Sequence, residues 1–220
     1  MYRFKFTILV IAFTSTLGYG LVLKPQQTHT QLKPSYKANQ LLEANKNENV
    51  IAFCKTVIPK LLNAPLIDSL EIAELYKYQN KAYYQLKDYL ESIKAIEKAI
   101  KFCDDTEEGR LLKGQLYSDK ASAYNYTEKD KATFNSTLNA IKYLRSVKNL
   151  DYDYLITSYR YLSEQCAYHG NFEDAKRYLR QAEELYNNNK KEVDLAVTRE
   201  DGYRSVSYTH LTLPTTCRVC

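Results

Sequence analysis

The side chains that most often perform chemistry are few in this chain. It contains three histidines among 220 residues. His169 stands beside Gly170 at the predicted end of a helix, where an imidazole is more often a helix-end cation than a metal ligand or a base. No metal-ligand spacing, phosphate-binding loop or nucleophile motif occurs. We therefore expect no catalytic residues, no cofactor, no metal site and no small-molecule substrate, in a protein that is not an enzyme.

The cysteines also point to packing rather than reactivity. Two of the five, Cys217 and Cys220, fall in a C-terminal tail considered below. We interpret Cys54, Cys103 and Cys166 as small buried hydrophobic residues. A disulfide needs two Cα atoms within about 7 Å of each other. These three cysteines belong to different predicted structural units, so we expect no disulfide between them.

The charge of the chain argues against a nucleic-acid partner. The formal net charge is +5, but Arg3 and Lys5 lie in a targeting segment and Arg218 lies in the tail. Without these three, 31 − 3 = 28 basic residues remain against 26 acidic ones. This balance is too close to neutral for a basic nucleic-acid-binding surface. Acidic and basic residues alternate over 97–110, as expected for solvent-exposed helix faces.

The first twenty residues have the order of a secretory signal peptide. Two cations precede an apolar run over 6–17, and glycines occupy the −3 and −1 positions at Gly18 and Gly20. The run is shorter than the roughly 20 residues of a spanning helix, which favours cleavage after Gly20 over an uncleaved anchor. Residues 21–34 are expected to form a flexible leader. We expect a bacterial exported protein, periplasmic or facing the outside, that meets a membrane only through the signal segment or a missing downstream anchor.

The elements that must position any binding residues come from an internal repeat. Residues 75–102, 116–143 and 158–185 align without a gap, and successive copies are 41 and 42 residues apart. Apolar residues recur at three- and four-residue steps on two segments of each copy, which predicts paired amphipathic helices. Aligned small residues would let two helix backbones approach closely. The aligned sets are Tyr76, Tyr117 and Tyr159; Tyr83, Tyr124 and Cys166; Ser92, Thr133 and Ala175; Ile96, Thr137 and Leu179; and Ala99, Ala140 and Ala182.

This pattern resembles the tetratricopeptide repeat family over about residues 66–188. The resemblance implies an all-α fold, a right-handed α-solenoid of antiparallel helix pairs. Gln79 and Asn80 replace the usual Leu-Gly pair in the first copy, Thr137 weakens the second, and no copy has the closing proline. The period exceeds the family's usual length of about 34 residues, and we attribute the excess to an extra turn on each helix. The third copy carries the signature best, at Tyr159, Leu162, Ser163, Cys166, Gly170, Ala175, Leu179 and Ala182.

The repeats divide residues 35–188 into helix pairs. We predict a degenerate first unit over 35–64 and full units over about 66–104, 106–147 and 151–188. Asp68 with Glu71 predicts a capping box, and Thr106 predicts a second N-terminal cap. Pro59 predicts a kink or an early end in its helix. The expected helices span 35–45, 48–62, 66–86, 88–103, 106–126, 129–147, 151–169 and 171–188.

The repeat pattern stops after residue 188. Residues 189–205 are expected to begin a further, truncated unit. The stretch SVSYTHLTLPTT over 205–216 has no charge and no helical spacing. Val206–Thr215 correspond codon by codon to a translated sequencing adapter, a transposase end joined to its primer site. We interpret 206–220 as an adapter artefact and the chain as the N-terminal fragment of a longer protein; the alternative is a natural Thr-rich tail.

The resemblance also implies where a partner would bind, because the first helices of tetratricopeptide units usually line a concave surface that holds a peptide or a partner helix. The family's clamp for a C-terminal carboxylate has Asn where Lys81 and Asp119 stand, which argues against recognition of a chain end. The alternative for each tyrosine is that it only covers helix surface. The candidate groove residues are Lys77, Tyr78, Lys81, Tyr84, Gln85, Ser118, Asp119, Ser122, Asn125, Tyr126, Arg160, Tyr161, Glu164 and Tyr168.

Three functions are compatible with this architecture. The favoured one is an exported protein–protein interaction scaffold that binds a peptide or a partner protein on the concave surface. In the second, the repeats are the input half of a membrane sensor, such as a histidine kinase or a transcription regulator. In the third, they precede a lost catalytic domain, such as a CHAT-like protease. A spanning segment after the repeats would favour the sensor, and a His-Cys pair would favour the protease.

Overall fold

The structure is a computed structural model that describes residues 33–190 and Val193. This part of the chain is entirely helical, and none of its helices is both long enough and apolar enough to cross a membrane. The predicted signal segment, most of the leader and the predicted adapter segment lie outside the described residues. The helices are α1 (Pro34–Glu43), α2 (Asn47–Leu62), α3 (Ser69–Gln85), α4 (Tyr89–Phe102), α5 (Glu107–Asn125), α6 (Asp130–Leu144), α7 (Tyr152–Tyr168) and α8 (Phe172–Asn188).

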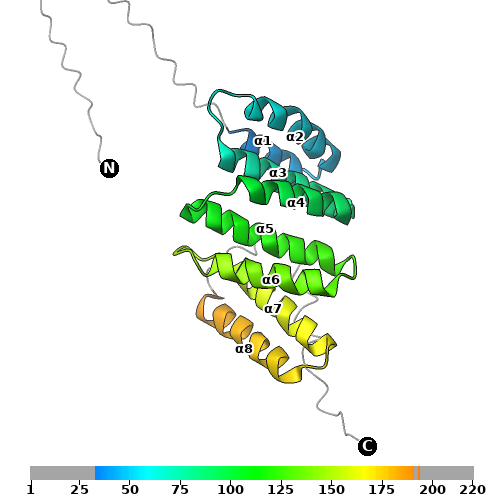
Figure 1. The fold of residues 1–220 in the computed structure, drawn as a ribbon, viewed down its shortest axis with the longest axis vertical. Helices are drawn as coiled ribbons and strands as arrows, with labels where there is room; N and C mark the ends of the chain where they lie inside the picture. The colour runs from blue at the N-terminus through cyan, green and yellow to red at the C-terminus, as the bar shows by residue number, and fades with distance from the viewer. Residues whose placement is uncertain (1–32, 191–192, 194–220) are drawn as a thin grey trace, which may run out of the picture. The chain divides into compact units, whose positions relative to one another are not determined.

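The helices form hairpins that stack in chain order, from α1–α2 through α3–α4 and α5–α6 to α7–α8 (Figure 1). This is an α-solenoid of antiparallel helix pairs, so the predicted fold class is confirmed. Contacts between neighbouring hairpins are asymmetric. The helices α1, α3, α5 and α7 contact one another in turn, whereas no two of α2, α4, α6 and α8 are in contact. We call the surface of the odd-numbered helices the inner face and that of the even-numbered helices the outer face.

Side-chain caps fix the starts of most helices. The Asp68 carboxylate accepts a hydrogen bond from the Glu71 N–H, and the Thr106 hydroxyl accepts one from the Gly109 N–H, as predicted. The second half of the predicted capping box is wrong. Glu71 does not turn back to Asp68; its buried carboxylate accepts hydrogen bonds from the N–H and hydroxyl of Ser35, at 2.6 and 2.9 Å. It thereby caps α1 and joins the first hairpin to the second.

One helix end agrees with the sequence-based expectation despite a proline, and another differs. The helix α2 ends at Leu62, as predicted, with Pro59 inside it, so of the two effects predicted for Pro59 the early end is wrong. Proline removes a single backbone donor, and the buried residues Cys54 and Ile58 hold the helix against its neighbours. The helix predicted over 129–147 ends at Leu144, because the next residues turn away and the Ser146 N–H bonds the Tyr143 carbonyl three residues back.

The turn inside each hairpin has the same backbone conformation. One residue per hairpin has a positive φ: Asn45 (53°), Lys87 (62°), Glu128 (54°) and Gly170 (76°). These residues lie 42, 41 and 42 positions apart, so the first, degenerate hairpin is in register with the other three. In every turn this N–H and the next one bond the last carbonyls of the preceding helix, the two-bond pattern of a Schellman motif.

The predicted small residues lie where paired helices cross, and all are buried: Ser92, Ala99, Thr133, Ala140, Ala175 and Ala182. The aligned tyrosines each stack on an aromatic ring of the paired helix: Tyr76 on Phe102, Tyr117 on Tyr143 and Tyr159 on Tyr178. Aromatic bodies therefore fill the space beside the small residues.

The cysteines of the described chain are free thiols. Cys54 and Cys166 are buried, as predicted, whereas Cys103 is only half-buried at the end of α4. Burial raises the pKa of Cys54 to about 12 and that of Cys103 to about 11. Both thiols are therefore protonated at neutral pH and unreactive.

Replacement of Lys87 or Glu128 by glycine should stabilise the protein. A side chain at positive φ costs about 1–2 kcal/mol, and glycine removes this cost while adding freedom to the unfolded chain. We expect Lys87→Gly and Glu128→Gly each to raise the free energy of unfolding by about 0.5–1 kcal/mol, measured by urea denaturation. Gly170→Ala is the reverse control and should lower it. A loss of stability in both glycine variants would contradict this account of the turns.

Candidate functional site

Hydrogen bonds between side chains connect the odd-numbered helices of the inner face. They join residues 38–40 positions apart, which is about one repeat. We call this set the inter-unit ladder. Between α3 and α5 its pairs are Lys77–Gln115 at 2.9 Å, Asn80–Asp119 at 3.0 Å and Tyr84–Ser122 at 2.7 Å; between α5 and α7 they are Ser118–Ser158 at 3.3 Å, Ser122–Tyr161 at 3.0 Å and Asn125–Gln165 at 3.4 Å.

Asn80 is the best-connected residue of the ladder. Its side chain is fully buried, accepts a hydrogen bond from the Ser92 hydroxyl of α4 at 2.6 Å and donates one to Asp119 of α5 at 3.0 Å. One amide thus connects three helices. This explains why Asn replaces the small residue of the family at this position. A glycine there would leave the buried Ser92 hydroxyl and the Asp119 carboxylate without this partner.

The half-buried carboxyl of Asp119 lies at the centre of the inner face. Burial raises the pKa of this carboxyl, while Lys81, Lys77 and the hydrogen bonds from Asn80 and Tyr154 act to lower it. Because the effect of burial is larger than that of these neighbours, ionisation of Asp119 destabilises the folded state. Two lysines of α3, Lys77 and Lys81, flank Asp119, so this part of the inner face carries charges of both signs.

An aromatic cluster borders the ladder at the carboxyl ends of α3 and α5. The rings of Tyr89 and Tyr126 stack with their centroids 4.8 Å apart, and Tyr84 meets both rings edge-on. Tyr126 is nevertheless 57% exposed, and Tyr168 at the end of α7 is 77% exposed. These two tyrosines occupy equivalent positions in consecutive units, 42 residues apart. The border of the inner face therefore presents apolar ring surface to solvent twice in succession.

The structure divides the predicted groove residues into two groups. Seven of them belong to the ladder, and of these Ser118 is buried and offers no surface to a partner. The ladder members are Lys77, Tyr84, Ser118, Asp119, Ser122, Asn125 and Tyr161.

The other seven predicted residues differ in their surroundings. Tyr78 packs against the core formed by α1 and α2, and burial raises its pKa to about 12. Arg160 pairs with Glu164 on the same helix at 3.4 Å. Lys81 lies beside Asp119, and Gln85, Tyr126 and Tyr168 are exposed. The surface that remains for a partner is thus the half of the inner face near the carboxyl ends of α3, α5 and α7.

Several ladder residues could not be recognised from the family pattern. Gln115 and Gln165 fall outside the signature positions, and Gln115 additionally donates to the Asp151 carboxylate, which caps α7, at 2.7 Å. The sequence did contain one signal for these residues. Polar residues recur about one repeat apart on the helix faces that carry no apolar residues. Within the described residues, no group of three or more His, Cys, Asp or Glu side chains could hold a metal ion.

Comparison with known proteins adds little to this geometry. No family model matches the chain, and no curated protein matches it. Among solved structures, the chain is similar to the crystal structure of MamA, with a TM-score of 0.46 and 17% identity over 71% of this chain and 89% of that chain. A likeness of this size identifies no family, partner or site.

Asp119→Asn should stabilise the protein at neutral pH. The raised pKa means that the folded state binds this proton more tightly than the unfolded chain does. The stability gained from Asp119 is therefore complete below its unfolded pKa of about 4 and is lost as the pH rises through the folded pKa. We expect the Tm of Asp119→Asn to exceed that of the wild type at pH 7 and the difference to shrink as the pH falls to about 4. Asparagine keeps an oxygen that accepts from Asn80.

The control for net charge is Glu183→Gln, at an exposed position of α8. It should show no such dependence on pH in thermal unfolding followed by circular dichroism. A lower Tm for Asp119→Asn at pH 7 would show that the fold needs the ionised carboxylate. A difference that is constant with pH would show that the effect does not come from ionisation of Asp119.

Proposed function

We propose that this chain is a protein–protein interaction scaffold that holds an internal segment of a partner protein on its inner face. The observation that carries the proposal is the pair of exposed rings, Tyr126 and Tyr168, at equivalent positions of consecutive units beside a fixed polar ladder. Tyrosine combines a broad apolar face with a hydroxyl and loses little freedom on binding. Exposed rings on a rigid support are typical anchors of a binding surface.

The polar side chains beside the rings indicate the kind of segment. Lys81, Asp119, Gln85 and Glu164 mix both signs of charge with a neutral amide. This favours a segment that is partly polar over a purely apolar one. Because Lys81 and Asp119 occupy the positions of the family's carboxylate clamp, we propose that the segment is internal rather than a chain end.

The spacing of the units sets the register of such a segment. Packed helices lie about 8–10 Å apart, and an extended chain rises about 3.3 Å per residue. One unit therefore corresponds to about three residues of an extended peptide. The two rings would contact side chains of the partner that are about three positions apart.

We further propose that the scaffold acts outside the cytoplasm, after cleavage of residues 1–20. The support is the order of charged, apolar and small residues in that segment. N-terminal sequencing of chain recovered from the periplasm or medium should begin at Leu21. An intact Met1 in that fraction would contradict cleavage. The sensor and the protease-linked functions are the alternatives, and no observation on the described helices supports either of them.

Selection from a random peptide library on the full-length chain should test the binding proposal. We expect enriched peptides to carry apolar or aromatic residues about three positions apart, as the unit spacing predicts. Because the chain contains no tryptophan, a single Trp in a selected peptide gives a specific fluorescence signal when it is excited at wavelengths that tyrosine does not absorb. Tyr126→Ala and Tyr168→Ala should each weaken binding by about 1–2 kcal/mol, or about 5- to 30-fold in Kd.

The matched control is Leu138→Ala, because Leu138 is a comparably exposed apolar residue on α6 of the outer face. It should leave the affinity unchanged. Failure to enrich any peptide would count against the proposal, as would selected peptides that bind both tyrosine variants with wild-type affinity.

A further inference from the structure

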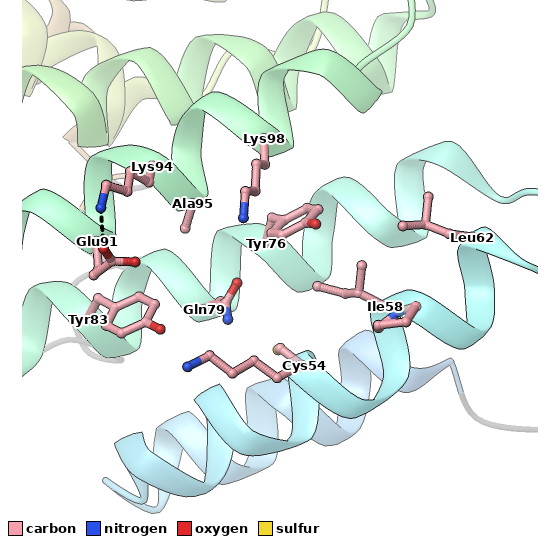
Figure 2. Close-up of a pocket in the computed structure, with 12 residues that line it drawn as sticks. Cys54, Ile58, Leu62, Tyr76, Gln79, Tyr83, Glu91, Lys94, Ala95 and Lys98 are labelled. Carbon is pink, nitrogen blue, oxygen red and sulfur yellow. Dashed lines mark hydrogen bonds and ion pairs between the residues drawn. The ribbon is translucent and has the colours of Figure 1, made fainter.

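The outer face contains a hollow between α2 and α4, with α3 as its floor. Its volume is about 260 Å³. Figure 2 shows Ile58 and Leu62 of α2 on one side, Lys94 and Lys98 of α4 on the other, and Tyr76 between them. The hollow is separate from the inner face, since its walls are even-numbered helices that do not contact each other.

Comparison with the next unit shows what is particular to this hollow. The residues equivalent to Lys55 and Gln79 are Glu97 and Lys120, one repeat further along the chain. Glu97 and Lys120 form an ion pair at 2.9 Å that connects α4 to α5. Lysine and glutamine cannot form this pair, so no such bridge connects α2 to α3. The hollow therefore lacks an ion pair at the position where the next unit has one.

The charge of the hollow is predominantly positive. It is lined by Lys55, Lys94 and Lys98, with Glu91 as the one acidic residue. Glu91 is already paired with Lys94 at 2.5 Å. Lys98 lies over the Tyr76 ring, with its Nζ 5.8 Å from the ring centroid. The hydrogen bond from Lys94 lowers the pKa of the Glu91 carboxyl, and the charges of Lys98 and Lys55 help to lower it. Neither Lys55 nor Lys98 forms an ion pair with another residue of the described chain. Two cations thus flank an apolar floor without an acidic partner in direct contact.

Exposed apolar residues also occur in the chain that leaves α2. Leu62, the last residue of α2, lines the hollow, and it is followed in the sequence by Leu66, which is 89% exposed, and by half-exposed Ile67. The lining of α2 alone, from Cys54 to Leu62, spans about 12 Å at 1.5 Å per residue. A lining of this length suits a peptide segment.

We infer that this hollow is a second docking site, which binds an acidic segment of a partner protein with apolar side chains facing Ile58, Leu62 and Tyr76. Lys55 and Lys98, which form no ion pair, would attract acidic residues of the segment, and the apolar floor would contact its apolar residues. A two-fold contact with a second copy of this chain is disfavoured, because it would bring the lysines of that copy to the same place. The scaffold would then hold two partners at once, one on each face.

The test uses the full chain and a fluorescein-labelled peptide of about four helical turns, with leucine at i, i+3, i+4 and i+7 and glutamate at most other positions. We expect saturable binding by fluorescence anisotropy, weaker at higher salt. A peptide with lysine in place of every glutamate should not bind. The double variant Lys55→Glu, Lys98→Glu should lose at least about tenfold in affinity.

The matched control is Lys131→Glu with Lys190→Glu, which makes the same change in net charge at exposed positions away from the hollow. It should bind as the wild type does. Circular dichroism should show that both double variants are folded. Tyr126→Ala should also retain binding, which separates this site from the inner face.

Three results would overturn the inference. One is no binding of the acidic peptide up to about 1 mM, the range of the weakest specific complexes. Another is equal loss of affinity in the two double variants, which would show only a general charge effect. The third is concentration-dependent dimerisation in sedimentation that Lys55→Glu, Lys98→Glu abolishes, which would assign the hollow to a second copy of the chain.

Discussion

Close contact between paired helices is the constraint on which the whole array depends. At the crossing of α5 and α6 there is no room for even one methyl group, since a Cβ on Gly114 would lie 2.8 Å from the Leu144 side chain. Buried small residues also lie on the second helices of the neighbouring pairs, Ser92 and Ala99 on α4 and Ala175 and Ala182 on α8. Compact hairpins can stack closely, and the odd-numbered helices of neighbouring hairpins lie within reach of side-chain hydrogen bonds, which require heavy atoms about 3 Å apart. The ladder thus depends on the packing of small residues, and the binding surface depends on the ladder.

The ladder divides the inner face into a structural and an exposed part. Polar side chains at its centre satisfy one another and hold α3, α5 and α7 in register. Rings at its border remain in contact with solvent because no helix covers them. A buried polar network fixes a unique arrangement when its members are satisfied. Rigid support of exposed rings lowers the entropy lost when a partner binds.

The fold could be predicted largely from the sequence, because period and residue size determine it. The aligned tyrosines and small residues placed six of the helices, and the caps Asp68 and Thr106 marked two starts. The second role of Glu71 could not be predicted, because its partner Ser35 lies 36 positions away in another hairpin. The ladder was missed for the same reason. A family pattern marks positions on a surface, but it does not say which of them bond to the neighbouring unit.

The ladder also has a consequence for how such an array can change. Most steps use different chemical pairs, such as a cation with an amide or an amide with a carboxylate, and only the hydroxyl pairs recur at both interfaces. A hairpin inserted, deleted or moved would meet several mismatched donors and acceptors, even though its backbone would fit. The shared turns and crossings make the hairpins similar in shape, while the ladder restricts which neighbours each one can take. Duplication or shuffling of whole hairpins should therefore be tolerated only where the polar pairs change with them.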